Sequence, residues 1–257
     1  MILSTEFLNF ILNNECKHLD LQNALLMVIM PLKDGINISK TLQLKSLNLF
    51  DCKDNSLCVL EELLGSCHSL QELSLSCLQL DTHIFYRVCT QNCKTLQVLD
   101  MSFYKGLDLT TIMLIVDLCV ELREINLDAT FPSDASINYL VNNITPKISK
   151  FSLKGSDVLD EHVDTLVSRC DKLTLLDLGA TKITNNSVTS IIDHLKHNLE
   201  ELYLTANKIH LTKLLELRKM PKLKALKCSF RKGSEGSDGQ NLKKHIPFAI
   251  VYEDVSL

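Results

Sequence analysis

Leu173-Thr-Leu-Leu-Asp-Leu-Gly-Ala-Thr181 is the stretch that decides the fold. It is a nine-residue phrase with aliphatic residues at positions one, four and six, and it recurs along almost the whole chain. Successive phrases begin 24 to 26 residues apart, at Leu44, Leu70, Leu96, Leu122, Ile148, Leu173, Leu199 and Leu223. A fixed period of this length predicts one structural unit that is repeated and stacked along the chain.

A repeat of this length has room for one short strand and one helix, the pattern of leucine-rich repeats. We therefore expect an α/β solenoid shaped like a horseshoe, with a parallel concave sheet and convex helices. A degenerate phrase at 17–21 adds a further strand, giving about nine repeats of ~26 residues. The unbroken period predicts a single domain over 1–257: an N-terminal capping and irregular repeat (1–43), regular repeats (44–231), and a flexible loop with a C-terminal cap (232–257).

The segments between phrases carry apolar residues at helical spacing, which predicts helices that turn one side to the core. Further helices are expected from Ser4 to about Asn13 and over about 240–245, with a flexible Gly/Ser loop at 232–239 and an extended piece at 248–252. The predicted stripes are Leu57, Leu60, Leu63 and Leu64; Leu114, Ile115 and Leu118; Ile137, Leu140 and Val141; Val163, Leu166 and Val167; and Val188, Ile191, Ile192 and Leu195.

Four cysteines, Cys67, Cys93, Cys119 and Cys170, each stand three residues before a phrase. An equivalent position in successive repeats predicts a structural column of small buried thiols. The close pair Cys89 and Cys93 has no second pair at zinc-finger spacing, so we expect no metal site. With no secretory signal at the N-terminus, the ten cysteines indicate reduced thiols in a cytoplasmic and/or nuclear protein.

The composition and the absence of known motifs argue against several classes of function. A formal charge of -4 and a pI near 6.1 argue against nucleic-acid or anionic-membrane partners. The sequence has no stretch long and apolar enough for a membrane span, and no Gly-x-Ser-x-Gly, Walker loop or His-Glu-x-x-His motif. Its histidines show no metal-ligand pairing. We therefore expect no enzyme activity and no cofactor, and a monomer that binds a protein.

Side chains alternate along a strand, so positions three, five and seven project from the concave face. These positions predict an acidic field that ends at Lys150 and Lys154, followed by a patch where Leu175 and Tyr203 stand among polar groups. An aromatic residue ringed by polar groups is typical of an interface anchor. The alternative is that these are ordinary solvated residues, with Tyr203 leaning on its neighbours. The predicted partner-binding residues are Glu72, Asp100, Glu124, Asn126, Asp128, Leu175, Asp177, Glu201 and Tyr203.

The helix-to-strand junctions resemble those of one known family. Leu63-Leu-Gly-Ser-Cys-His-Ser-Leu-Gln-Glu-Leu-Ser-Leu75, the stretch from Asp164 to Leu178, and Leu214-Leu-Glu-Leu-Arg-Lys-Met-Pro-Lys-Leu-Lys-Ala-Leu226 are similar to cysteine-containing repeats of F-box leucine-rich-repeat proteins. That resemblance implies a substrate-binding domain of an SCF-type ubiquitin ligase receptor, whose F-box docks the Skp adaptor and cullin.

Fewer than twenty residues precede Leu19, too few for an F-box. Two expectations stay open: a longer form carries the F-box, or the chain is a free-standing scaffold or inhibitor that binds one protein without a ligase role.

Overall fold

The computed structural model describes residues 2–4, 16–27, 43–54, 58–231 and 235–254. Within it the chain forms two compact units, Met1–Leu122 and Arg123–Leu257. Each unit is an array of leucine-rich repeats in which a short strand begins at position three of a phrase, spans three residues in most repeats, and is followed by a return segment, in most repeats a helix. The expected fold class is confirmed; the expectation of a single domain stays a prediction.

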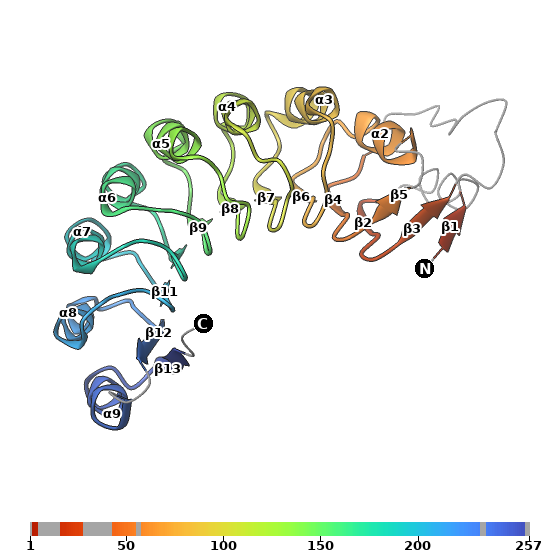
Figure 1. The fold of residues 1–257 in the computed structure, drawn as a ribbon. Helices are drawn as coiled ribbons and strands as arrows, with labels where there is room; N and C mark the ends of the chain where they lie inside the picture. Colours follow the sequence, from red (N-terminus) through yellow and green to blue (C-terminus); the bar gives the residue numbers. More distant parts are fainter. Residues whose placement is uncertain (1, 5–15, 28–42, 55–57, 232–234, 255–257) are drawn as a thin grey trace, which may run out of the picture. The chain divides into compact units, whose positions relative to one another are not determined.

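In the first unit, four parallel strands follow one another in sequence order. Their central residues are the position-four leucines, for example Leu47 beside Leu73. Figure 1 shows the strands along one side of this unit and the helices along the other. The elements are β2 (His18–Asp20), β4 (Ser46–Asn48), α2 (Cys58–Gly65), β6 (Glu72–Ser74), α3 (Thr82–Asn92), β7 (Val98–Asp100) and α4 (Leu109–Leu118).

A small additional sheet in the first unit was not expected from the sequence. It joins β1 (Ile2–Ser4), β3 (Leu25–Met27) and β5 (Lys53–Asp54), all parallel. Ser4, which we expected to begin a helix, instead ends β1. The rest of that predicted helix, and the Pro31–Gly35 interruption, lie outside the described residues.

The second unit repeats the same pattern over six parallel strands, again in sequence order. Helices cover one face of this sheet and leave the other face open (Figure 1). The elements are β8 (Glu124–Asn126), α5 (Asp134–Asn143), β9 (Lys150–Ser152), α6 (Asp160–Arg169), β10 (Leu175–Asp177), α7 (Asn185–Leu195), β11 (Glu201–Leu204), α8 (Leu211–Leu214), η1 (Leu215–Lys219), β12 (Ala225–Arg231), α9 (Glu235–His245) and β13 (Ala249–Asp254).

The core lies between strands and helices. In the phrase that opens the repeat of β10, Leu173, Leu176 and Leu178 are all fully buried, and the equivalent residues of the other seven regular phrases are 0 to 4% exposed. This confirms that positions one, four and six point inward. Three of the predicted helix stripes, on α5, α6 and α7, are buried as expected.

Two parts of the helix prediction were wrong. On α4 the core-facing residues are Ile112, Ile115 and Val116, while Leu114 and Leu118 are half-exposed. The cause is the start of the helix: Asp108 caps it by accepting a hydrogen bond from the Thr111 N–H at 2.8 Å, and this start sets which side chains face inward.

The C-terminal helix also begins earlier than predicted, at Glu235, within the stretch expected to be a loop. Gly239 lies buried in this helix, and a Cβ there would come within 3.4 Å of the Val251 Cγ1. Packing of α9 against β13 therefore overrides the low helix propensity of Gly239.

The cysteine column is interrupted at one position. Cys67, Cys119 and Cys170 are buried as predicted, but Cys93 is half-exposed. The backbone of Cys93 is still helical, whereas Cys119 and Cys170, which end α4 and α6, have left the helical region. The helical conformation therefore continues one residue further here than in those two repeats, and the residue that faces the core shifts by one position. Asn92 takes the buried place instead. Its Oδ1 accepts from the Leu70 N–H at 2.9 Å, and its Nδ2 donates to the carbonyls of Cys67 at 3.1 Å and Val88 at 2.9 Å.

The turn after the strand uses a left-handed backbone at position eight of every described phrase except the last, where Phe230 continues strand β12. The φ angle is 52° at both Ala129 and Ala180 and 77° at Gly155. Position nine then bonds back to position six: the hydroxyls of Thr130 and Thr181 donate to the carbonyls of Leu127 and Leu178 at 2.7 and 2.8 Å. The equivalent left-handed residues in other repeats are Asn23, Asp51, Cys77, Phe103 and Ala206.

One carboxylate links two repeats of the second unit. Asp160, the first residue of α6, accepts hydrogen bonds from the backbone N–H groups of Thr184 at 2.8 Å and Ser187 at 3.2 Å, and from both of their hydroxyls. Thr184 and Ser187 belong to the first turn of α7, where the backbone N–H groups have no partner inside the helix. Asp160 thus supplies a cap for the helix of the following repeat.

Candidate functional site

The open sheet face carries the residues predicted to bind a partner, and the structure distributes them over both units. In the first unit, Glu72 on β6 is exposed, and Asp100 on β7 is half-buried. The Asp100 carboxylate accepts a hydrogen bond from the Ser102 N–H at 2.9 Å, a local turn contact. The predicted acidic field includes these two residues and two others, Glu124 and Asp128, that belong to the second unit.

In the second unit, the acidic residues contact the neighbouring strand. Glu124 pairs with Lys150 at 2.9 Å, and the Asp128 carboxylate accepts from the Ser152 hydroxyl and, at 3.1 Å, from the Lys154 N–H. Asn126 accepts from the Asp128 N–H at 3.0 Å. An ion pair as exposed as Glu124–Lys150 contributes about 0 to 1 kcal/mol to stability. The Glu124 carboxylate is thus paired with the Lys150 ammonium group, whereas Asp128 bonds to the backbone of Lys154, so the acidic field is partly neutralised within the sheet.

The apolar part of the prediction forms a contiguous surface, which we call the Tyr203 patch: Leu175, Asp177, Glu201, Tyr203 and Lys227. Strand register places Leu175 beside Glu201, and Tyr203 between Asp177 and Lys227. All five side chains are half-buried. The patch spans β10, β11 and β12, so three successive repeats contribute to it.

Two contacts fix the Tyr203 ring. The hydroxyl donates to the Glu201 carboxylate, and the Lys227 ammonium lies 4.0 Å from the ring centroid. A cation over the face of an aromatic ring is attracted by the negative potential of that face. Burial, the hydrogen bond to Glu201 and the nearby carboxylate charges raise the pKa of Tyr203 to about 12, so the phenol is neutral at physiological pH. Tyr203 does rest on its neighbours, and it also presents part of a rigid ring to solvent.

Asp177 is the second ionisable group of the patch. Burial and the charge of Asp128 raise the pKa of Asp177. The hydrogen bond from the Gly179 N–H at 2.9 Å and the charges of Lys154 and Lys227 lower it, but the net shift is upward. Gly179 itself leaves no room for a side chain, because a Cβ would lie 2.7 Å from the Thr205 Oγ1. The strand ends are therefore closely packed beside the Tyr203 patch.

Sequence reasoning missed three residues of this surface. Lys227 was not among the predicted residues, and neither were Ile250 and Tyr252 of β13, which are 47% and 46% exposed. Ile250 pairs in register with Lys227, so the open face continues to the end of the sheet. More buried and more exposed positions alternate from Ala249 to Tyr252, as in a strand with one open face. We expected this extended stretch to belong to the C-terminal cap and did not include it in the binding face.

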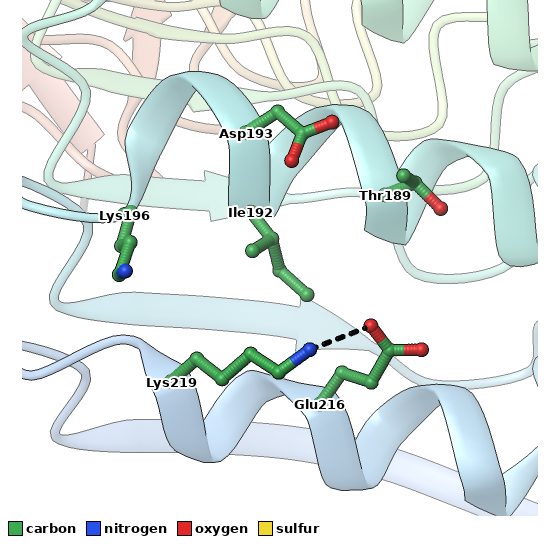
Figure 2. Close-up of a pocket in the computed structure, with 6 residues that line it drawn as sticks. All are labelled: Thr189, Ile192, Asp193, Lys196, Glu216 and Lys219. Atoms are coloured by element: carbon green, nitrogen blue, oxygen red, sulfur yellow. Dashed lines mark hydrogen bonds and ion pairs between the residues drawn. The ribbon is translucent and has the colours of Figure 1, made fainter.

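The helix side of the second unit has a cavity of about 290 Å³ between α7 and η1, shown in Figure 2. Asp193 and Lys196 line one wall and Glu216 and Lys219 the other, with the last two joined at 3.2 Å. Ile192 supplies its apolar lining. The two carboxylates and two ammonium groups balance one another, and nothing in this arrangement selects a charged ligand.

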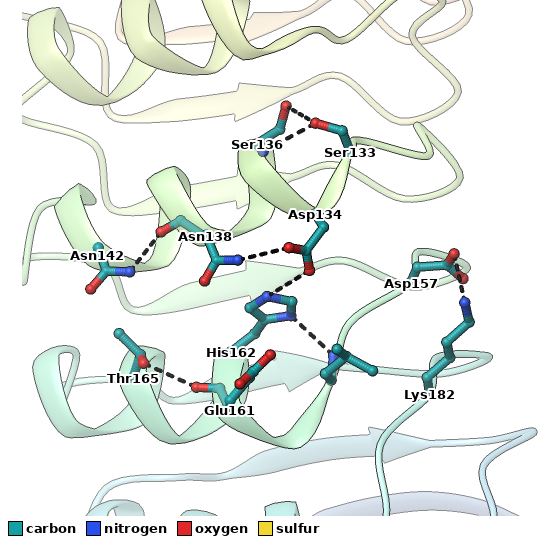
Figure 3. Close-up of polar contacts among 11 residues, drawn as sticks. Ser133, Asp134, Ser136, Asn138, Asn142, Asp157, Glu161, His162, Thr165 and Lys182 are labelled. Atoms are coloured by element: carbon teal, nitrogen blue, oxygen red, sulfur yellow. Dashed lines mark hydrogen bonds and ion pairs between the residues drawn. The ribbon is translucent and has the colours of Figure 1, made fainter.

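A polar cluster at the start of α5 and α6 is drawn in Figure 3. The buried His162 accepts a hydrogen bond at Nδ1 from the Leu159 N–H at 3.1 Å, and its Nε2 lies 3.4 Å from the Asp134 carboxylate. On the adjoining loops, Asp157 pairs with Lys182 at 2.8 Å. These contacts join one repeat to the next, which indicates a structural role.

Within the described parts of the chain, no group of three or more His, Cys, Asp or Glu side chains is placed to hold a metal ion. The described helices also include none of the length and hydropathy that a bilayer crossing requires.

Comparison with known proteins identifies the repeats. Residues 8–230 match the family model of the SKP2 LRR domain, in agreement with the resemblance found in the helix-to-strand junctions. A search of curated proteins gave no match.

Among solved structures, an internalin from Listeria monocytogenes is 14% identical with a TM-score of 0.52, over 100% of this chain and 86% of that chain. The TLR13–ssRNA13 complex is 18% identical with a TM-score of 0.48, over 73% of this chain and 29% of the TLR13 chain. At these identities the internalin similarity shows the fold alone.

Proposed function

The chain belongs to the family of SKP2 leucine-rich repeat domains, and from this premise we propose that it is the substrate-recognition part of an SCF-type ubiquitin ligase receptor. As a member of that family it is a leucine-rich-repeat interaction domain. In the proposed role it holds a protein substrate on its open sheet face, and a longer form or an associated subunit connects it to the Skp adaptor and cullin. The chain contributes recognition to protein turnover in the cytoplasm or nucleus, and the ligase supplies the catalysis.

The observation that carries the proposal for this site is the Tyr203 patch. An aromatic ring held in one orientation loses little side-chain entropy on binding, and aromatic anchors supply a large share of interface energy. Leu175 extends the apolar surface on one side, and Lys227 adds a positive charge directly over the ring. The Glu201 carboxylate accepts a hydrogen bond from the Tyr203 hydroxyl, so the hydroxyl needs no partner from the substrate.

These features define the chemistry of a fitting substrate segment. It presents an apolar side chain to Leu175 and Tyr203 and an acidic or carbonyl group to Lys227. Asp177 lies in the same patch and disfavours a second acidic group beside it, because two neighbouring carboxylates repel one another. We therefore expect recognition of a mixed apolar and polar segment.

The first test measures partners of the endogenous protein. We would immunoprecipitate it from its own cells and determine its intact mass and its co-purifying proteins by mass spectrometry. Co-purification of Skp adaptor and cullin, together with a protein whose half-life lengthens when the chain is depleted, is the expected result. Recovery of a stable partner with neither ligase subunit would contradict the ligase role and establish a free-standing scaffold.

The second test asks whether the Tyr203 patch is the binding surface. Tyr203→Ala should leave the fold intact and make the binding free energy of the captured partner less favourable by at least about 1 to 2 kcal/mol. Tyr86→Ala is a matched control, since Tyr86 is 51% exposed and lies on helix α3. Equal affinities for the Tyr203 variant, the Tyr86 variant and the unmodified chain would remove the Tyr203 patch from the site.

A further inference from the structure

We propose that two copies of this chain associate through β13, in an antiparallel pairing about a two-fold axis at Val251. The inference starts from the end of the sheet in the second unit, where β13 follows β12. Among the described residues of this unit, no strand pairs with the far edge of β13. An uncovered edge offers backbone N–H and C=O groups to another strand.

The length of this edge favours pairing. The six residues of β13 are in unbroken parallel register with β12, whereas β8, β9 and β10 each have three residues. Natural edges are commonly protected by proline, charged side chains, a bulge or a short strand. Ala249 to Tyr252 contain neither proline nor a charged residue, and the register has no bulge.

The strand register fixes which backbone groups are free. In the inner strands, residues at positions three and five bond to the preceding strand, as Leu175 N–H does to Ser149 O at 3.1 Å. Ile250 is in register with position-five Lys227, so Ile250 and Tyr252 point to β12, while Val251 and Glu253 point to the free edge. The Ala249 N–H already donates to Ile246 O at 3.0 Å, and its carbonyl also points to that edge.

An antiparallel pair centred on Val251 brings complementary groups together. Val251 faces Val251 of the second copy, and Ile250 faces its Tyr252, so the two half-exposed apolar side chains meet twice by symmetry. Pairs of an aromatic with a β-branched residue stabilise adjacent strands. The pairing is lateral, and it leaves the open face of each copy uncovered.

The charges are also self-complementary. The last turn of α9 contains Lys243, Lys244 and His245, just before β13, and the strand ends with Glu253 and Asp254. In the proposed register, residues 253–254 of one copy lie opposite residues 248–249 of the other, next to its basic turn. Opposite charges at the two ends of the strand favour an antiparallel second copy, since a parallel copy would align like charges.

Sedimentation equilibrium of the 257-residue chain tests the association. The expected mass rises with concentration from 29.0 kDa towards twice that value. Tyr252→Lys should raise the dimer dissociation constant at least about tenfold, and Tyr86→Lys should not change it. Ile250→Glu is a second variant in case the first disturbs the fold, and circular dichroism checks both. A mass of 29.0 kDa at every concentration up to about 100 μM would overturn the proposal.

Hydrogen exchange locates the contact. Amides of Val251 and Glu253 should exchange at least about tenfold more slowly in concentrated protein than in dilute protein, because pairing would place them in hydrogen bonds. A dimer without that change, or one that Tyr252→Lys leaves intact, would place the interface elsewhere and refute pairing through β13.

Discussion

Asn92→Ala should lower the free energy of unfolding of the first unit by more than the loss of one side-chain hydrogen bond would. Asn92 is fully buried, accepts from the Leu70 N–H and donates to the Cys67 carbonyl, so it joins the end of α3 to the preceding repeat. Alanine leaves both of these buried backbone groups without a partner. An unsatisfied buried group costs about 1 to 3 kcal/mol, so we expect a loss of about 2 to 5 kcal/mol in the free energy of unfolding.

A graded series of variants tests the reason for this loss. Cys67 Sγ donates to the Leu63 carbonyl four residues earlier, as Asn92 Nδ2 does to Val88. Asn92→Cys should therefore keep that local contact, lose the bond from Leu70, and cost less than Asn92→Ala. Asn198→Ala is the matched control, because the half-buried Asn198 side chain makes one bond to the neighbouring repeat, from its Nδ2 to the Asp171 carbonyl at 2.8 Å.

Urea denaturation followed by circular dichroism gives the free energies, and amide exchange at Leu70 reports the lost bond directly. The reasoning fails if Asn92→Ala and Asn198→Ala differ by less than about 0.5 kcal/mol, or if the Leu70 amide stays protected.

Three further predictions concern the core, the pH dependence and the thiols. Leu178→Ala should lower the free energy of unfolding by about 2 to 5 kcal/mol, because a fully buried layer is emptied; a loss under about 1 kcal/mol in urea denaturation would contradict the register. Burial alone would raise the pKa of Asp160, but hydrogen bonds from Ser187 and Thr184 outweigh it and lower the pKa. The stability that Asp160 contributes is therefore present above its unfolded pKa of about 4 and is lost as pH falls through the folded value, so unfolding curves of Asp160→Ala and the unmodified chain should converge in acid. Burial raises the pKa of Cys67 and Cys228 to about 12. Iodoacetamide at about pH 8 should label the half-exposed Cys16, Cys77 and Cys93 before the buried Cys67 and Cys228, and peptide mass spectrometry showing equal rates would contradict this order.

The strands could be predicted because their signal is local and repeated. Each phrase carries its own inward leucines, and eight copies in one period set the register of β4 and of β6 to β12 without any knowledge of long-range contacts. Helix phase was less predictable. On α4 the cap at Asp108, rather than the count of leucines, decides which side is buried, and Cys93 shows that one extra helical residue moves a side chain out of the core.

The candidate site was predictable as a set of positions and less so as a set of contacts. Alternation along the strands identified Tyr203 and Leu175, and the structure places them side by side with Asp177 and Glu201. The position of Lys227 over the ring depends on side-chain conformation, which no spacing rule supplies. Ile250 and Tyr252 belong to a strand outside the repeat period, so the pattern that located the others could not reach them.

The cap that Asp160 lends to α7 constrains how such a chain can gain or lose repeats in evolution. The carboxylate lies in one repeat and its four hydrogen-bond donors lie in the next, so a deletion with its boundary between them would strip the start of α7 of its cap. A duplication that copied either repeat alone would join the carboxylate to a neighbour that had not evolved to receive it. A change of length that keeps these two repeats adjacent preserves the cap, whereas one that separates them loses it.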